Sequence, residues 1–202
     1  MEIFIFIGIG CFAFLVIIAV LAVLFFKTYE APGVRAGKRG EKEAAEIIKQ
    51  VLQKEDILLT NVCVKYKEKE TELDNVIINR RGVFIIEVKN YSGTLTGKED
   101  DYEWTKYKVS RCGNTYEKQV RNPIKQVRRQ VYILARFLKD SGIRVWVDGY
   151  VLLLNNNSPV HNDMVLESFE GIDRALHGRA HHSLNSGAVA AIKELLQYQS
   201  KS

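Results

Sequence analysis

The sequence predicts an α/β domain built around a mixed sheet and preceded by one transmembrane helix. Three features lead to this prediction: an uncharged apolar run at the N-terminus, helical and strand patterns that alternate after it, and one almost unbroken apolar strand in mid-chain. A chain of 202 residues has room for one ordinary domain and an appendage. Its formal net charge of +5 is compatible with nucleic acid or anionic lipid and selects neither.

The N-terminal segment is apolar on every face. From Ile3 to Phe26 it contains no charged residue and no Pro, and a helix of this length, at about 1.5 Å per residue, would cross a hydrocarbon core of about 30 Å. A cleaved signal peptide would have a basic start, a shorter apolar stretch and a small-residue cleavage site, whereas Met1-Glu2 precedes this run. We therefore expect an uncleaved transmembrane anchor over residues 1–26.

The flanking charges predict the orientation of this anchor. Basic residues lie only on its C-terminal side, within the stretch that the positive-inside rule counts: Lys27, Arg35, Lys38 and Arg39. We expect a single-pass membrane protein of a prokaryotic plasma membrane with its soluble domain in the cytoplasm. Cys63 and Cys112, the two cysteines beyond the span, form no disulfide framework, as is typical of a reducing compartment.

The rest of the chain divides into a linker over residues 27–36, a core over 37–154, and a C-terminal extension over 155–202 that ends in a helix. Pro32-Gly33 breaks the linker, and helical periodicity starts at Gly37. The elements expected after the linker are a helix from Gly37, strands over 57–67, 72–79 and 83–89, short strands around 94–97 and 104–109, a helix from Pro123 capped by Asn122, a strand over 144–154 and a helix over 187–197.

A carboxylate and an amine follow buried residues on one face of the strand over 83–89. Because side chains alternate along a strand, Glu87 and Lys89 share a face with Val83 and Ile85. Glu and Lys on a strand are often a solvated face, but the neighbours here are apolar, which favours a functional site.

The preceding hairpin predicts a second carboxylate at the same place. With a two-residue loop, Asp74 falls directly opposite Glu87, whereas a slip of one residue would turn it to the other face. Like charges directly opposed destabilise a sheet, and a divalent ion such as Mg²⁺ between them would remove the conflict. Such a pair suits phosphodiester hydrolysis, in which the ion polarises the phosphate and lowers the pKa of bound water. Lys89 would orient the water or stabilise charge at phosphorus.

Glu41 on the first helix is a candidate third ligand. It lies four residues before Ala45 on the apolar stripe of the helix, where burying an unpaired carboxylate is costly. The alternative is a solvated position in the first turn, favoured by the helix dipole.

These residues resemble the nuclease-related domain family, which is similar to the PD-(D/E)XK nuclease superfamily. The resemblance covers about residues 37–140 and follows these motifs in order: Gly40-Glu41, Glu72-Leu73-Asp74-Asn75, Gly82 to Gly93, Trp104, and Asn122-Pro123-Ile124-x-Gln126. It implies a restriction-endonuclease-like αβββαβ core with a mixed central sheet and divalent-metal-dependent cleavage of nucleic acid. One departure is Asn75, where the family often has His. Asn can form hydrogen bonds but cannot titrate, so this position offers no group that could transfer a proton.

The resemblance also implies a set of site residues. The catalytic set is Glu41, Asp74, Glu87 and Lys89, and the metal ligands are Asp74, Glu87 and Glu41. Gln126 and Tyr91 are accessory candidates, although Gln126 could equally pack beside the helix cap. Tyr91 and Trp104 could stack on bases, but packing in the core is favoured.

Two further groups have a simpler interpretation. The basic residues at the start of the helix from Pro123 either meet phosphates or form a solvated face; they are Arg121, Lys125, Arg128 and Arg129. The histidines 177, 181 and 182 are interpreted as a surface cluster, since no third convincing ligand completes a metal site.

The sequence therefore predicts a membrane-anchored nuclease that uses Mg²⁺ or Mn²⁺ to hydrolyse phosphodiester bonds of cytoplasmic DNA or RNA. The alternative is a non-catalytic module that binds nucleic acid or protein while tethered at the membrane. The expected partners are nucleic acid and, through Ile3–Phe26, the membrane; no small-molecule cofactor is expected.

Overall fold

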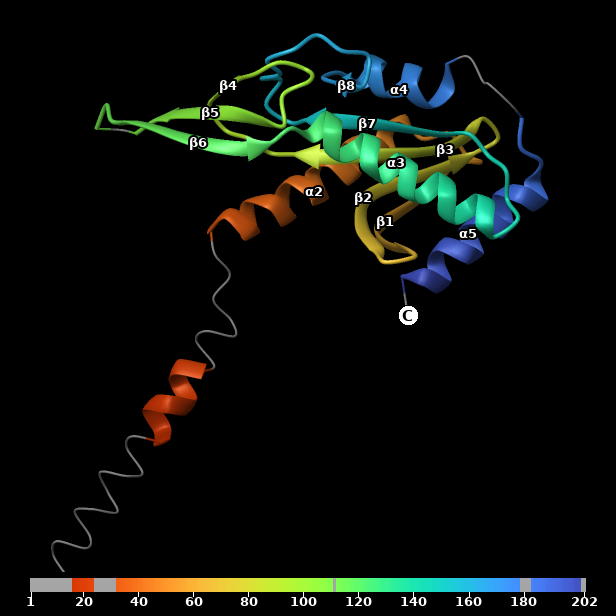
Figure 1. Cartoon of the computed structure of the whole chain (residues 1–202), viewed down its shortest axis with the longest axis horizontal. Coiled ribbons are helices and arrows are strands. Elements are labelled where there is room, and N and C mark those ends of the chain that lie inside the picture. The colour runs from red at the N-terminus through yellow and green to blue at the C-terminus, as the bar shows by residue number, and fades with distance from the viewer. Residues whose placement is uncertain (1–15, 24–31, 111, 179–182, 201–202) are drawn as a thin grey trace, which may run out of the picture. The chain divides into compact units, whose positions relative to one another are not determined.

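The computed structural model describes residues 16–23, 32–110, 112–178 and 183–200 (Figure 1). The chain forms two units, Met1–Lys38 and Arg39–Ser202, and the packing described below is that of the second. The elements are helix α2 (Pro32–Val51), strands β1 (Ile57–Tyr66), β2 (Lys69–Asn79), β3 (Gly82–Lys89), β4 (Thr94–Thr96), β5 (Glu103–Val109) and β6 (Thr115–Arg121), helix α3 (Pro123–Asp140), strands β7 (Val147–Leu153) and β8 (Val165–Leu166), and helices α4 (Phe169–His177) and α5 (Ser186–Gln199).

The predicted transmembrane helix is contradicted. Of the expected span over residues 3–26, the structure describes a helical stretch at residues 16–23, and the remainder lies outside the described residues. In the parts of the chain that the structure describes, no helix is both long and apolar enough to cross a membrane. A bilayer core of about 30 Å needs roughly 20 apolar helical residues, which the described stretch does not supply. The predicted localisation as a single-pass membrane protein is therefore not retained.

The main sheet is mixed, as predicted. Its five strands follow the order β1-β2-β3-β7-β8. The first three are antiparallel neighbours, whereas β7 runs parallel to both β3 and β8. The apolar strand β3 lies at the centre of the sheet, where both of its faces are covered, and this explains why apolar residues occupy both of its faces.

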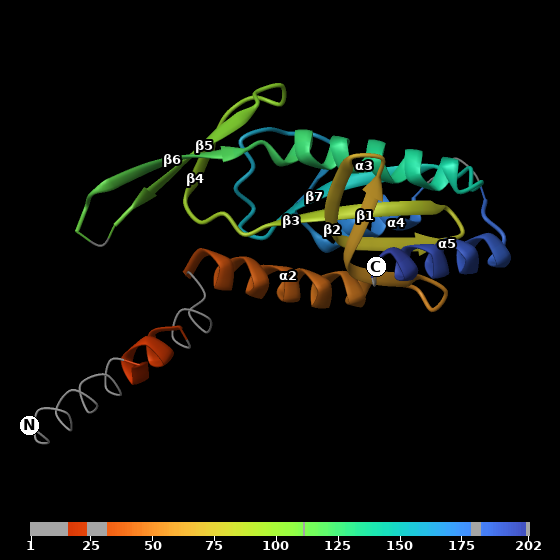
Figure 2. The same ribbon diagram turned by 60° about the horizontal axis from the view of Figure 1, so that its bottom comes forward.

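Helices cover both faces of this sheet (Figure 2). On one face, α3 packs against β3 and α5 packs against β1 and β2, and their apolar side chains form one cluster with Val83 and Ile85 of β3. On the other face, α2 and α4 pack against Phe84 and Ile86 in a second cluster. The domain therefore has three layers, and the helices α4 and α5 from beyond residue 154 help to complete them.

Helix α2 begins at Pro32, earlier than the start at Gly37 that the apolar pattern predicts, and Ala44 and Ile48 are its fully buried residues. Its close approach to the sheet depends on Gly40. A Cβ atom at this position would lie 2.8 Å from the Cβ atom of Asn90, just beyond β3. Glycine thus brings the next residue, Glu41, towards the C-terminal end of β3.

His177 is a structural residue and does not belong to a surface cluster. Its side chain is only 7% exposed, and its ring nitrogens Nδ1 and Nε2 lie 2.7 Å from Asp173 and 2.8 Å from Asp56. These contacts tie α4 to the segment before β1. The interpretation of His177 as a surface residue is therefore wrong, and residues 181 and 182 lie outside the described residues.

Gly149 in β7 allows α3 to pack closely on the sheet, which gives a first testable prediction. A Cβ atom at Gly149 would overlap the side chain of Val131 and lie 2.9 Å from Cγ2 of Val127. We expect Gly149→Val to lower the free energy of unfolding by about 1–3 kcal/mol, the usual effect of overpacking a core, as measured by urea denaturation. Gly171→Ala is the control, because its Cβ would only reach ordinary contact with Ser168 at 3.4 Å. Equal urea midpoints for both variants would contradict the prediction.

Candidate active site

The β2–β3 hairpin has the register that the sequence predicts. Ile78 lies opposite Val83, and the ladder continues to the pair Asn75 and Ile86. One step further, the same register sets Asp74 opposite Glu87. At this point Oδ2 of Asp74 accepts a hydrogen bond of 2.8 Å from the backbone N–H of Val88. The carboxylate of Asp74 is thereby fixed against the C-terminal end of β3.

The backbone of β1 is irregular at the same level. Thr60 pairs with Asn75 and Val62 pairs with Leu73, which leaves Asn61 between them with a φ of 53°. Few residues other than glycine adopt this left-handed conformation. Strained backbone of this kind often accompanies functional sites, and here it lies beside Asp74.

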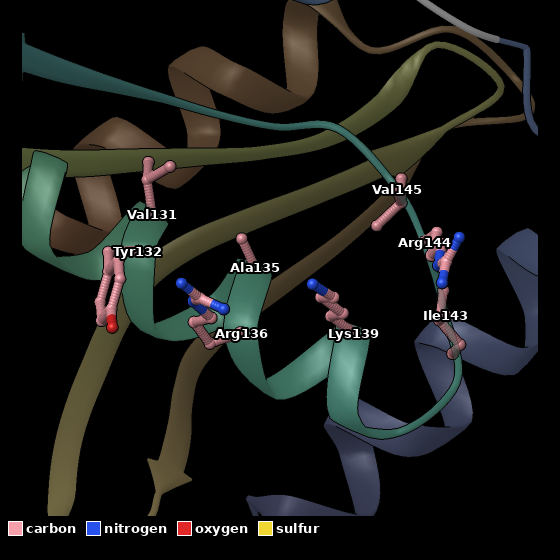
Figure 3. A pocket seen from close by; sticks show the side chains of 8 residues that line it. All are labelled: Val131, Tyr132, Ala135, Arg136, Lys139, Ile143, Arg144 and Val145. Carbon is pink, nitrogen blue, oxygen red and sulfur yellow. The ribbon is translucent and has the colours of Figure 1, made fainter.

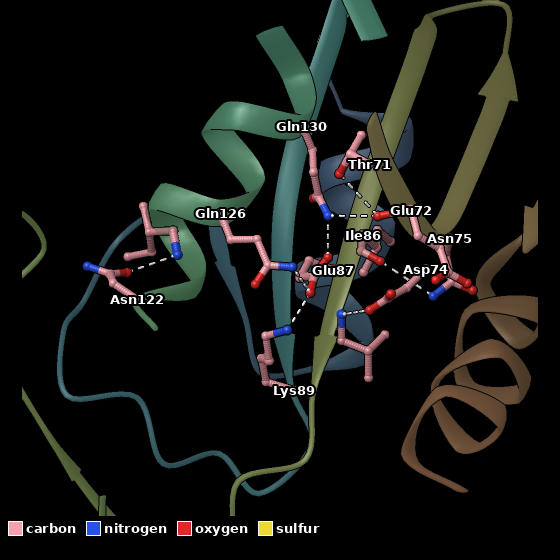
Figure 4. A network of polar contacts seen from close by, with 12 residues as sticks. Thr71, Glu72, Asp74, Asn75, Ile86, Glu87, Lys89, Asn122, Gln126 and Gln130 are labelled. Carbon is pink, nitrogen blue, oxygen red and sulfur yellow. Dashed lines mark hydrogen bonds and ion pairs between the residues drawn. The ribbon is translucent and has the colours of Figure 1, made fainter. Parts of the chain in front are cut away.

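Glu87 is a buried carboxylate with three donors around it (Figure 4). Its side chain is 2% exposed. Lys89 Nζ and Gln126 Nε2 both donate to Oε1, and Gln130 Nε2 donates to Oε2 at 2.6 Å. A buried charge is stable only when it is paired and hydrogen-bonded, and this arrangement meets both conditions.

Helix α3 carries both glutamines to Glu87 because its N-terminus is anchored. Asn122 caps the helix through Oδ1, which accepts from the N–H of Ile124 at 2.9 Å. Its Nδ2 donates to the backbone carbonyls of Glu99 at 2.9 Å and Asp101 at 2.8 Å. Gln126 lies one turn into the helix, and Gln130 follows one turn later on the same face.

Gln130 is a site residue that the sequence analysis missed. It is 1% exposed and also donates to the backbone carbonyl of Glu72 at 3.2 Å. The signal that could have revealed it is its position in the sequence. Gln130 follows Gln126 at i, i+4 and precedes the buried Ile133 and Leu134, so it shares the core-facing side of the helix.

The negative charges of Asp74 and Glu87 interact unfavourably. Burial and, after it, the negative charge of Glu87 raise the pKa of Asp74 to about 7. The backbone N–H of Val88 and the charge of Lys89 oppose this shift, while Glu41 adds to it. The influence of Glu41 on Asp74 indicates that the carboxylate of α2 lies within electrostatic range of the strand pair.

Lys89 remains positively charged at this site. Burial disfavours its ammonium group, but the charge of Glu87 and the hydrogen bond to it outweigh burial, so the pKa of Lys89 is raised. Tyr91 lies close to the same charges. Burial raises its pKa, Lys89 opposes that effect and Glu87 adds to it. Of the predicted residues, Glu87, Lys89 and Gln126 are thus in direct contact, and Asp74, Glu41 and Tyr91 surround them.

Two other motif residues, Trp104 and Asn75, are buried in the domain. Trp104 is fully buried, and its Nε1 donates to the carbonyl of Lys98 at 2.9 Å, which confirms the interpretation of Trp104 as a core residue. Asn75 is 1% exposed and donates weakly to the carbonyl of Ile86 at 3.4 Å. Its buried Oδ1 has no hydrogen-bond partner among the described residues. Asn75 thus supplies no titrating group.

The donor set is compatible with a hard divalent cation. Mg²⁺ prefers oxygen ligands and commonly uses one or two carboxylates, with waters and phosphate oxygens completing its shell. Asp74 and Glu87 offer such a pair, and a cation would relieve the repulsion that raises the pKa of Asp74. Over the described residues, no group of three or more His, Cys, Asp or Glu is placed to hold a metal ion. Oε1 of Glu87 accepts hydrogen bonds from both Lys89 and Gln126, whereas Oε2 accepts one from Gln130, so Oε2 is the oxygen with remaining acceptor capacity for a cation.

A groove at the far end of α3 is chemically different (Figure 3). Apolar side chains of α3 and of the segment that follows it form the groove, together with Arg136, Lys139 and Arg144. None of its lining residues is a carboxylate or a histidine. This groove is therefore not a candidate for metal-dependent chemistry.

Comparison with known proteins links this geometry to one family. The family model described as nuclease-related domain matches residues 36–154, which include all of the predicted site residues. An uncharacterized protein of Bacillus anthracis is 38% identical over 71 residues, which are 34% of this chain and 33% of that protein. The chain thus matches about a third of the length of this curated relative. No solved structure matches significantly.

Proposed function

This chain belongs to the nuclease-related domain family, and on that premise we propose that it is a divalent-metal-dependent nuclease that hydrolyses phosphodiester bonds in nucleic acid. The observation that carries the proposal is the pair Asp74 and Glu87 with Lys89 beside it at the end of β3. Two buried carboxylates that repel each other destabilise the fold, so stability alone does not explain this pair. It is useful at a site that receives a cation and a phosphate.

The residues divide into three roles. Asp74 and Glu87 would hold Mg²⁺ or Mn²⁺, since hard cations of this kind prefer carboxylate oxygens. Glu41 would join them as a third ligand only after its side chain moves closer, because the described residues hold no ready group of three such ligands. The bound ion would polarise the phosphate and lower the pKa of a water molecule. Lys89 contributes a positive charge that stabilises the negative charge developing on the phosphate oxygens.

Gln126 and Gln130 would act as positioning residues. Their side-chain amides donate to opposite oxygens of Glu87, which fixes the plane of its carboxylate. Supporting groups of this type hold a metal ligand in one orientation. Tyr91 lies near Lys89 and would help to shield it from water.

The test is cleavage of plasmid DNA and of labelled RNA by the full chain, with Mg²⁺ or Mn²⁺ and with EDTA. We expect metal-dependent cleavage, and we expect Glu87→Gln to lower its rate by about a hundredfold or more because a charged ligand is lost. Glu46→Gln is the matched control, since Glu46 is exposed on α2 and pairs only with Lys49 in the described residues. If the wild-type protein and Glu87→Gln show the same trace activity, the proposal is wrong.

One observation favours a rival function, a non-catalytic module that binds nucleic acid or protein. Both oxygens of Glu87 already accept hydrogen bonds from protein side chains, so this carboxylate has partners without a metal ion. Isothermal titration of Mn²⁺ into the wild-type protein and into Asp74→Asn separates the two functions. Binding that the variant loses supports the nuclease, and no binding to the wild-type protein supports the rival.

A further inference from the structure

A ribbon of two strands projects from the domain at the end where β3 terminates (Figures 1 and 2). Its strands β5 and β6 pair antiparallel, and the short β4 joins β5 at the base. Residues Thr115–Gln119 of β6 are exposed on both faces of the ribbon. The base of the ribbon joins the core through Trp104 and Leu95, but its outer part is exposed. An uncovered hairpin is marginally stable, so the hydrophobic core does not account for this outer part.

One face of the ribbon gathers positive charge. Lys106 lies directly opposite Lys118, and Lys108 lies opposite Tyr116 on the same face. Like charges directly opposed destabilise a strand pair. Neither Lys106 nor Lys118 forms a salt bridge with another described residue. The arrangement is therefore unfavourable unless an anion neutralises it.

This basic face leads to the candidate active site. Lys106 Nζ lies 5.9 Å from the centre of the Tyr91 ring. Tyr91 in turn is close enough to Lys89 and Glu87 for their charges to act on its hydroxyl group. Positively charged side chains thus lie on both sides of Tyr91, Lys89 at the candidate site and Lys106 on the ribbon.

We propose that the basic face of the ribbon, formed by Lys106, Lys108 and Lys118, binds the phosphates of double-stranded DNA and places the duplex at the candidate active site. This inference rests on the proposed function. The negative charge of closely spaced phosphates complements the three lysines, which have no carboxylate opposite them on this face.

The shape of the ribbon favours a DNA duplex over other nucleic acids. The major groove of B-form DNA admits a two-stranded β-ribbon, whereas the deep and narrow major groove of A-form RNA does not admit side chains. Single strands are usually held by successive aromatic rings. On the described part of this face, Tyr116 is the one exposed aromatic residue.

The test is the affinity of the full chain for a fluorescent DNA duplex, measured by anisotropy in EDTA so that no cleavage occurs. We expect Lys106→Gln/Lys118→Gln to bind about tenfold more weakly. The slope of log K against log salt should fall in magnitude by about 1.8, because each lost phosphate contact removes about 0.9. Lys106→Arg/Lys118→Arg should retain the affinity, and thermal melting followed by circular dichroism checks that each variant folds.

The matched control removes the same charge elsewhere. Arg136→Gln/Lys139→Gln alters the groove in Figure 3 and should leave the affinity within about twofold of the wild type. The ribbon proposal is overturned if the wild type does not bind the duplex, or if the ribbon variant binds as tightly as the wild type. Equal loss in the control, or equal affinity for duplex RNA or single-stranded DNA, also overturns it. Because binding is measured without metal, its result is independent of whether the protein cuts.

Discussion

Replacing Lys89 with Met is expected to lower the free energy of unfolding by about 3–5 kcal/mol, the usual effect of removing one partner of a buried ion pair. Met matches the length of the Lys side chain but carries no charge. Glu87, which is 2% exposed, would then have only the amides of Gln126 and Gln130 as donors. Neutral amides do not replace the attraction of an ammonium group in a dry environment.

A double-mutant cycle measures this coupling directly. Glu87→Gln should also lower the free energy of unfolding, because it leaves the ammonium group of Lys89 buried without its charged partner. Lys89→Met/Glu87→Gln should recover most of the loss of either single variant, because neither charge of the pair remains. Urea denaturation at pH 7 gives the four free energies of unfolding. Lys49→Met is the control, since Lys49 pairs with Glu46 at the surface, where both side chains are more than half exposed. Its effect should stay below about 1 kcal/mol. If Lys89→Met lowers stability equally in the presence and absence of Glu87→Gln, the two residues are not coupled.

The sequence predicts the Asp74–Glu87 pair because the loop of the β2–β3 hairpin is short. A two-residue loop after Asn79 leaves one register in which apolar residues of β2 and β3 face the same layers, and that register sets Asp74 opposite Glu87. The periodicity of β3 and the Asn122-Pro123 cap of α3 are also local signals, and both elements form where expected. Local pattern therefore determines the strands and the helix that build the site.

The other parts depend on contacts distant in sequence. The spacing from Gln126 places Gln130 on the core-facing side of α3, but Gln130 reaches Glu87 because α3 crosses the sheet beside β3, and the sequence pattern does not encode this crossing. His177 is buried because Asp56, far from it in sequence, closes over its ring. Strand β6 has no apolar alternation, since both of its faces are exposed, and so the sequence analysis missed it. The apolar run at the N-terminus predicts a span from composition alone, and the described residues contain no such helix.

The second large effect is expected from the pH dependence of stability. The pKa of Asp74 is raised to about 7 in the folded protein, first by burial and then by the charge of Glu87, whereas an unfolded Asp titrates near about 3.9. A group with a raised pKa stabilises the fold fully below its unfolded pKa and loses that contribution as pH rises through the folded pKa. Stability should therefore fall between about pH 4 and pH 7 and then level off, by as much as about 4 kcal/mol for a shift of this size.

Asp74→Asn should remove this decline. Asn cannot ionise, but its carbonyl oxygen can still accept the N–H of Val88, so the anchor to β3 is kept. In EDTA at pH 8, the variant should be more stable than the wild type by a few kcal/mol, and at pH 4 the two should converge. Urea denaturation across this pH range measures the difference, and parallel curves for the two proteins would contradict it. Adding Mg²⁺ at pH 8 should then stabilise the wild type and not the variant, because an ion bound between Asp74 and Glu87 favours the folded state alone. The carboxylate of Asp74 would thus lower the stability of the protein without the cation and raise it with the cation. This links the fold of the β2–β3 hairpin to the chemistry proposed for it.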